Sequence, residues 1–225
     1  MRGPIGSRFV VRAACVLGLV LLSVTSPSLC QSASQTTRQD DTRLQLERGE
    51  ALLRQGNLKG AGEAARRALE QNPSSAEGHY LLGRVFLHDR KPEKAAEAFA
   101  RSLALRPASP GVLRDLAGIY VLQGKLADAE QTLVRAIEAD PHQIASYLDL
   151  AKLYERRQDP ASAKKTYQRA LTVEPDQPEA LFQLATLLDQ HGESKDARET
   201  ATRLTTVSPK HADGWYLSGR IAEKN

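Results

Sequence analysis

The chain has 225 residues, enough for one or two ordinary domains or for one elongated array of small units. Aromatic residues make up 5% of it and hydrophobic residues 41%, so a core must consist mainly of Ala, Leu and Val, which favours closely packed helices over an aromatic-rich β-sandwich. Residues 1–30 contain three of the 31 basic residues and no acidic residue. The rest of the chain has 28 basic and 27 acidic residues, so its charges nearly balance. It therefore lacks the overall positive charge that is typical of a nucleic-acid-binding protein.

Residues 1–30 are predicted to be a secretory signal peptide. The basic start "MRGPIGSRFVVR" precedes "AACVLGLVLLSV", an apolar run of about a dozen residues that is too short for a typical bilayer span. Cleavage after Cys30 would place Ser28 and Cys30 at the small-residue positions, and a nearby serine is an alternative. We therefore expect a periplasmic or secreted protein.

Two other readings of this segment stay open: a lipid anchor on Cys30, which the large preceding Leu29 disfavours, and an uncleaved membrane anchor. Because Cys15 lies in the apolar run, cleavage after Cys30 would leave no cysteine for a disulfide or for thiolate chemistry. Residues 31–41, "QSASQTTRQDD", have almost no apolar content and are predicted to form a flexible polar linker.

From residue 42 the sequence repeats with a period of 34 residues. Five similar segments end in proline at that interval: "RALEQNP", "RSLALRP", "RAIEADP", "RALTVEP" and "RLTTVSP". A fixed period of this length indicates stacked structural repeats. The units are 42–75, 76–109, 110–143, 144–177 and 178–211, followed by 212–225, which is half of a sixth unit.

Each unit is predicted to be a pair of antiparallel helices. Position 8 is always Gly or Ala and position 20 of every complete unit is Ala, so the two backbones can approach closely. Larger apolar residues recur at intervals of three and four, as in Tyr147, Leu150 and Tyr154. All prolines beyond residue 30 fall at positions 1, 17 and 32, outside the helix interiors. Three glycines share position 15, where the first helix should end: Gly56, Gly124 and Gly192.

This pattern resembles the tetratricopeptide repeat (TPR). The fourth unit matches the TPR signature best, with Tyr147, Leu150, Ala151, Tyr154, Ala163, Tyr167, Ala170 and Pro175. The first unit matches less well, because Gln45 and Arg48 replace apolar residues. The resemblance covers residues 42–225 and implies an all-α, right-handed superhelical solenoid whose first helices line a concave groove for peptides or partner proteins. Combined with the predicted export signal, it suggests a bacterial-type envelope.

The stretch "DGWYLSGRIAEKN", residues 213–225, is expected to be a first helix that remains from a decayed or cut sixth unit and now caps the array. Arg220, Glu223 and Lys224 suit a polar outer face. Trp215 and Gly219 stand where a following helix would normally pack, so we expect a frayed last turn and a partly exposed Trp215.

No catalytic motif remains once the repeat has accounted for the apolar residues. The sequence contains no phosphate loop, no HExxH and no nucleophile elbow, and its five histidines form no i, i+4 pair. The carboxylates are spread as on solvated helix faces. We therefore expect a protein that is not an enzyme and needs no cofactor and no metal.

On the TPR mapping, positions 2, 5, 9 and 12 face the groove. The residues at position 5 are Leu46, Tyr80, Arg114, Leu148, Phe182 and Tyr216, and those at position 9 are Glu50, Arg84, Gly118, Lys152, Thr186 and Arg220. The predicted partner-binding patch is Tyr80, Arg84, Arg114, Lys152 and Phe182, because aromatic anchors supply burial and cations pair with carboxylates of an extended segment. The alternative is that position 5 is partly packing and the cations only keep the surface soluble.

The function expected from these features is a protein–protein interaction scaffold that binds a peptide or partner protein in the groove. No nucleic-acid partner is expected, and membrane contact would occur only through an uncleaved or lipidated N-terminus. The chaperone-tail carboxylate clamp of this family is not supported, because Leu46 and Glu50 replace its Lys and Asn. Two alternatives stay open: a docking or regulatory arm of an enzyme whose catalytic part is absent from this chain, and self-association through unfinished ends.

Overall fold

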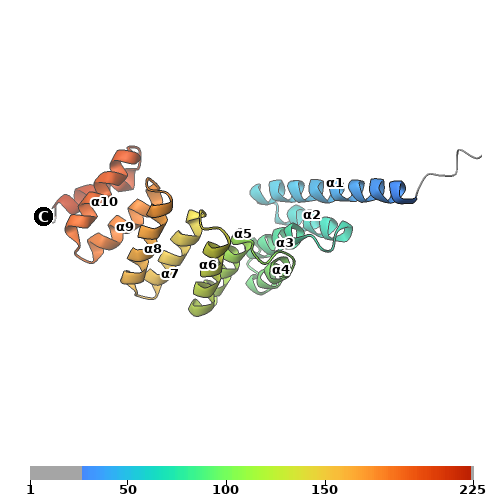
Figure 1. Ribbon diagram of the computed structural model, residues 1–225, viewed down its shortest axis with the longest axis horizontal. Coiled ribbons are helices and arrows are strands. Elements are labelled where there is room, and N and C mark those ends of the chain that lie inside the picture. Colours follow the sequence, from blue (N-terminus) through green and yellow to red (C-terminus); the bar gives the residue numbers. More distant parts are fainter. Residues whose placement is uncertain (1–26, 224–225) are drawn as a thin grey trace, which may run out of the picture.

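The computed structural model describes the backbone of residues 27–223 and the side chains of residues 38–223, and this part of the chain contains eleven α-helices and no β-strand (Figure 1). Most of the predicted signal peptide therefore lies outside the described residues. No helix within residues 27–223 is both long enough and apolar enough to cross a membrane. The helices are α1 (Pro27–Arg54), α2 (Leu58–Gln71), α3 (Ala76–His88), α4 (Pro92–Leu105), α5 (Pro110–Leu122), α6 (Leu126–Ala139), α7 (Ile144–Arg156), α8 (Pro160–Val173), α9 (Pro178–Gln190), α10 (Ser194–Val207) and α11 (Ala212–Glu223).

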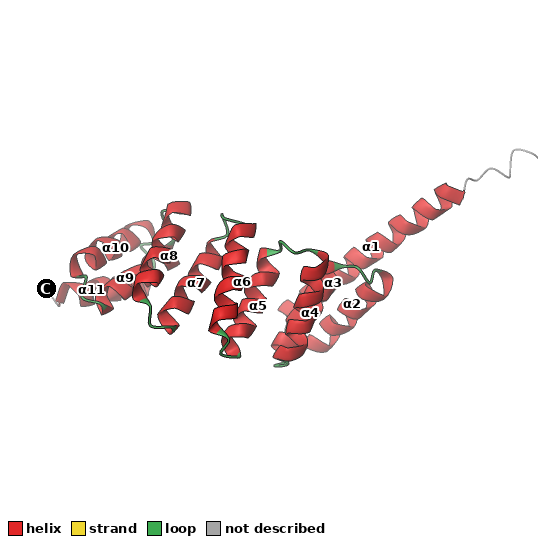
Figure 2. Cartoon of the chain, turned by 60° about the horizontal axis from the view of Figure 1, so that its bottom comes forward, coloured by secondary structure: helices red, strands yellow, loops and turns green. Residues whose placement is uncertain are grey.

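The helices pack in consecutive pairs, α1 on α2, α3 on α4 and so on to α9 on α10, and α11 packs on α10 and α9. Figure 2 shows these pairs side by side along the length of the molecule. First helices of neighbouring units also contact each other, as in α1 with α3, α5 with α7 and α9 with α11, which places them on the inner side of the array. The predicted all-α solenoid of antiparallel helix pairs is confirmed.

The turn between the two helices of a unit depends on one left-handed residue at position 15. Gly56, Gly124 and Gly192 have φ angles of 76°, 73° and 76° there, as the sequence pattern predicted. Arg90 and Gln158 occupy the same position in units 2 and 4 with φ angles of 56° and 59°, although residues with a Cβ rarely adopt this conformation. The second helices of these two units begin with proline, which suits the first helical turn.

The two helices of a unit meet at the small residues of positions 8 and 20. All five position-20 alanines are completely buried: Ala61, Ala95, Ala129, Ala163 and Ala197. At position 8, a Cβ on Gly83 would lie 2.4 Å from the ring of Phe99, itself completely buried. The absence of side-chain volume at these positions therefore allows the close helix packing that the repeat requires.

The N-terminal segment differs from the prediction, because residues 31–41 belong to α1 and do not form a linker. No Gly or Pro occurs between Pro27 and Gly49, and the following half of α1 already packs on α2. Extending an existing helix costs much less than nucleating one, so even a polar segment with no apolar face can continue it. In Figure 2 this end of α1 projects beyond the other helices.

The helix α11 buries Leu217 and Ile221 against the array. Trp215 is 56% exposed, which confirms the predicted partial exposure. Its indole Nε1–H donates a hydrogen bond of 2.9 Å to the carbonyl oxygen of Pro209. The last two residues lie outside the described residues, so the expected fraying there stays a prediction.

Candidate partner-binding groove

Polar pairs on the inner face link each unit to the next, and we call them the junction pairs. They are Arg84 Nη1 with Glu50 Oε1 (2.8 Å), Tyr80 OH donating to Asp115 Oδ2 (3.0 Å), Arg114 Nε with Asp149 Oδ2 (2.7 Å), Lys152 Nζ with Glu179 Oε1 (3.1 Å) and Arg220 Nη2 with Asp189 Oδ2 (2.8 Å). One such pair occurs at every junction between the units described. The three cations of the predicted patch, Arg84, Arg114 and Lys152, are therefore already paired with carboxylates of neighbouring units.

Both members of the Tyr80–Asp115 pair have raised pKa values. Burial, together with the Asp115 carboxylate, raises the pKa of Tyr80 to about 12. Burial also raises the pKa of Asp115, although the hydrogen bond from Tyr80 and the nearby Arg84 and Arg114 act in the opposite direction. The guanidinium carbon of Arg84 lies 5.6 Å from the centre of the Tyr80 ring, so unit 2 presents a cation stacked on an aromatic ring.

The Lys152–Glu179 pair is more exposed than the Arg114–Asp149 pair. Gln183 donates a hydrogen bond of 2.8 Å to Glu179 Oε1, and this bond together with Lys152 holds the pKa of the Glu179 carboxyl below its usual value. The side chain of Lys152 is 48% exposed. Its ammonium group can therefore donate a hydrogen bond to a second carboxylate while it remains paired with Glu179.

The structure brings the predicted patch together only in part. Tyr80 and Arg84 lie together on α3, and Arg114 and Lys152 line one pocket on α5 and α7. Phe182 does not line that pocket, and its ring centre lies 5.3 Å from that of His211. Nothing in these contacts tests partner binding, so the patch stays a prediction.

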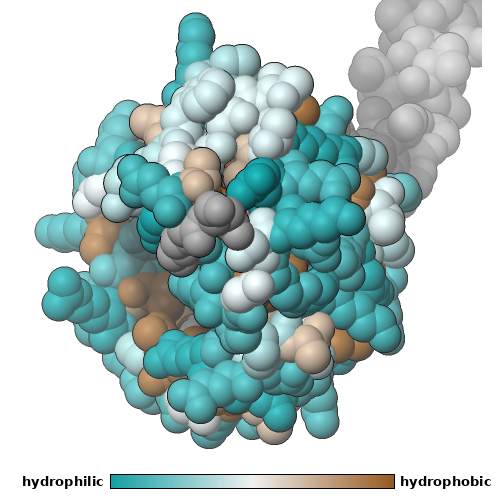
Figure 3. Space-filling model, turned by 90° about the vertical axis from the view of Figure 1, so that its left-hand side faces the viewer, coloured by the Kyte–Doolittle hydropathy of each residue, from teal (hydrophilic) through white to brown (hydrophobic). Residues whose placement is uncertain are grey.

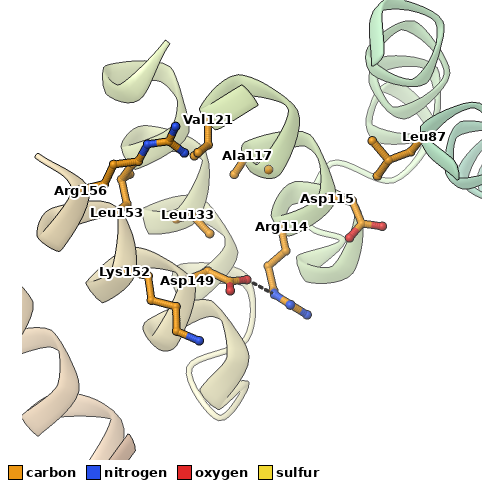
Figure 4. A pocket seen from close by; sticks show the side chains of 11 residues that line it. Leu87, Arg114, Asp115, Ala117, Val121, Leu133, Asp149, Lys152, Leu153 and Arg156 are labelled. Atoms are coloured by element: carbon orange, nitrogen blue, oxygen red, sulfur yellow. Dashed lines mark hydrogen bonds and ion pairs between the residues drawn. The ribbon is translucent and has the colours of Figure 1, made fainter. Parts of the chain in front are cut away.

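The pocket shared by Arg114 and Lys152 has a volume of about 390 Å³ and opens on the inner face between α5 and α7 (Figure 4). Its apolar lining is Leu87, Ala117, Gly118, Val121, Leu133 and Leu153, and its charged lining is Arg114, Asp115, Asp149, Lys152 and Arg156. Figure 4 shows Arg114 paired with Asp149, while Lys152 and Arg156 extend from α7. A space-filling view from the C-terminal end also shows hydrophobic surface gathered in a hollow with hydrophilic residues around it (Figure 3).

Sequence reasoning missed the carboxylates of this pocket and Arg156. Asp115 and Asp149 stand at position 6 and Arg156 at position 13, outside the four positions assigned to the groove. One signal was available: Gly118 lies inside a predicted helix, at a groove position where the neighbouring units carry Arg84 and Lys152. A glycine there predicts a gap in the wall of side chains.

Comparison with known families gives two matches. Residues 28–168 match the family described as cytochrome c-type biogenesis protein H TPR domain, and residues 154–221 match a tetratricopeptide repeat family. No curated protein matches the sequence significantly.

Solved TPR structures resemble most of the chain. PilF of Pseudomonas aeruginosa is 26% identical with a TM-score of 0.74, over 84% of this chain and 86% of PilF. TTC0263, a thermophilic TPR protein of Thermus thermophilus, is 26% identical with a TM-score of 0.59, over 83% of this chain and 97% of its own. YrrB, described as a TPR protein with an unusual peptide-binding site, is 22% identical with a TM-score of 0.59, over 73% and 84% of the two chains.

Proposed function

From the premise that this chain belongs to the TPR family described as cytochrome c-type biogenesis protein H TPR domain, we propose that it is a non-enzymatic scaffold that binds an extended segment of a partner protein in its groove. TPR repeats are generally protein-interaction modules without catalytic activity. The observation that carries the proposal is the pocket of about 390 Å³ on the inner face, which combines an apolar lining with a charged rim. The peptide-binding site named for YrrB lends support at the level of the fold.

The groove is preformed, which favours binding. The junction pairs and the continuous packing of neighbouring units hold the first helices in place before a partner arrives. Little ordering entropy is then lost on the scaffold side, so more of the interaction free energy appears as affinity.

We also propose that the protein acts outside the cytoplasm, on the basis of the basic and apolar pattern of residues 1–30. Expression of the full chain in a bacterium, followed by fractionation and N-terminal sequencing, tests this. We expect a processed protein in the periplasmic or secreted fraction that begins just after Cys30 or a nearby serine. A full-length protein confined to the cytoplasm would contradict export.

Site-specific photo-crosslinking tests the groove. A photoreactive phenylalanine analogue replaces Val121 or Thr186 on the inner helices, or the exposed Thr202 on α10 as a control. We expect the same partner to be captured from Val121 and Thr186 but not from Thr202. Capture from Thr202 alone, or equally from all three positions, would contradict groove binding.

Charge reversal of the predicted patch tests groove binding less clearly than photo-crosslinking does. Changing Arg84, Arg114 and Lys152 to Glu would place new carboxylates against Glu50, Asp149 and Glu179. Like charges at these junctions would disturb the stacking of the units, so a loss of binding would not separate contact with the partner from a change in the scaffold.

A further inference from the structure

We propose that the pocket between α5 and α7 selects partner segments in which a large apolar residue lies beside an internal Asp or Glu. This inference rests on the proposed function, because it names what the groove recognises at one junction. It depends on three features of the pocket: an empty helix position, an apolar floor and an unpaired cation on the rim.

The empty position is Gly118. A Cβ at this residue would meet no atom within 4 Å, whereas the equivalent positions of the flanking units carry Arg84 and Lys152. Glycine is a poor helix former, so Gly118 weakens its own helix and leaves space in the groove. The resulting pocket of about 390 Å³ lies within the range of about 300–1,000 Å³ of ligand pockets.

The floor selects an apolar side chain. Ala117, Leu133 and Leu153 are 1%, 2% and 3% exposed, and they offer only hydrocarbon to the pocket through their side chains. Leu87 and Val121 add apolar walls from α3 and α5. A buried Leu or Phe side chain is the occupant that gains most from this surface, because apolar burial contributes about 25 cal/mol per Å².

The rim selects one negative charge. Asp149 pairs with Arg114, and Asp115 accepts the hydrogen bond of Tyr80, so both acids of the pocket are engaged. Arg156 is exposed on α7, one turn after Lys152, and forms no ion pair with any of the described residues. Three cations and two carboxylates line the pocket, so the lining carries one excess positive charge, that of Arg156, which a carboxylate of the partner would complement.

The position of the pocket favours an internal residue over a chain end. It lies between units 3 and 4, with two units before it and two units or parts of units after it in the described chain. The inner helices continue the groove in both directions, so a segment that runs through it presents a side-chain carboxylate at this point. A terminal carboxylate is the competing source of the same charge.

Four labelled peptides in a Gly-Ser background test the specificity by fluorescence anisotropy and by chemical-shift titration of the full chain, up to millimolar concentration. Three have blocked termini and a central Phe-Glu, Phe-Gln or Ala-Glu pair, and the fourth ends in Phe with a free carboxylate. We expect Phe-Glu to bind roughly tenfold more tightly than Ala-Glu or Phe-Gln, since each loses about 1.4 kcal/mol or more. Equal affinities, tighter binding of the free carboxylate or no binding at all would overturn the inference.

Two pairs of variants locate the effect. Gly118→Leu fills the pocket with a better helix former, and Gly219→Leu makes the same change at a helical glycine that also has no atom within 4 Å of its Cβ position but lies outside the pocket. Arg156→Gln removes the unpaired cation, and Arg198→Gln removes an exposed cation on α10. We expect Gly118→Leu to reduce Phe-Glu binding more than roughly tenfold and Arg156→Gln to lower it to the Phe-Gln level, with both controls unchanged.

The photo-crosslinking experiment separates failure of this inference from failure of the proposed function. If Gly118→Leu leaves Phe-Glu binding and partner capture at Thr186 unchanged, the pocket is not the selective element although the groove still binds. If partners are captured only at Thr202, the groove itself is not the binding surface and both proposals are wrong.

Discussion

Asp115 is a carboxylate of the inner face whose protonation is linked to the stability of the fold. Its carboxylate accepts a hydrogen bond from the hydroxyl of Tyr80, but burial disfavours the charged form and raises its pKa. The protonated form is therefore relatively favoured in the folded protein. Stability from this group is complete below the unfolded pKa of about 3.9 and is lost as pH rises through the higher folded pKa.

We predict that Asp115→Asn becomes increasingly stable relative to the unmodified protein as the pH rises from about 4 to 7, because Asn keeps an acceptor for Tyr80 and carries no charge. Urea unfolding of both proteins across this range measures the difference. Asp159→Asn is a control: hydrogen bonds from Ser162 lower the pKa of Asp159, so its stabilising effect is lost only as pH falls below about 4 and should change little between about pH 5 and 7. If the difference in unfolding free energy from the unmodified protein varied with pH in the same way for both variants, the prediction would be wrong.

At the scale of the helix, position 8 determines how closely the two helices of a unit can pack. Gly83 faces the ring of Phe99, and a Cβ would lie 2.4 Å from it, whereas Gly219 at the same position of α11 faces open space. We predict that Gly83→Ala destabilises the protein by about 1–3 kcal/mol, because overpacking outweighs a helix-propensity gain of about 1 kcal/mol. Gly219→Ala should be neutral or stabilising by up to about 1 kcal/mol. If the two variants unfolded at the same temperature and the same urea concentration, Phe99 would have to move aside without loss of stability.

The junction between α5 and α7 offers a second test at this scale. Arg114 and Asp149 are 32% and 40% exposed, so their ion pair should contribute modestly, about 0.2–1 kcal/mol. A double-mutant cycle of Arg114→Ala and Asp149→Ala, measured by urea unfolding, isolates that coupling. We predict that it decreases in 1 M salt, where exposed charges are screened. A coupling near zero at low salt would mean that packing alone holds the junction.

The boundaries of the helices were predictable because their signals are local. Gly124 ends α5 at position 15, and Pro160 begins α8 after the capping residue Asp159, whose side chain accepts from the backbone of Ser162. The junction pairs were not predictable from the period, because their spacing changes from one junction to the next. Arg84 pairs with a residue 34 positions away, and Lys152 with one 27 positions away. Such pairs depend on the rotation between units and on side-chain rotamers, which no periodic pattern specifies.

Over the whole molecule, the core is unevenly distributed. The buried side chains of α2 are all alanine, and the largest completely buried side chains described, such as Tyr167, Phe99 and Leu81, lie beyond unit 1. One cluster of buried residues extends from Ala117 to Ile221, whereas the N-terminal units contain two smaller clusters. Unit 1 therefore gains less free energy from apolar burial than units 4 and 5.

We predict from this distribution that the array opens from its N-terminal unit. In a solenoid each unit contacts only its neighbours, so local stability follows local burial and need not equal that of the whole. Hydrogen exchange followed by mass spectrometry should show faster exchange in α2 than in α8. Leu204→Ala, which removes a completely buried side chain in α10 at a cost of about 2–5 kcal/mol, should accelerate exchange in α9–α11 and leave α2 unchanged. The prediction is wrong if hydrogen exchange is equally fast in α2 and α8, or if Leu204→Ala accelerates hydrogen exchange in α2. Either result would show that the units unfold together and do not open one at a time.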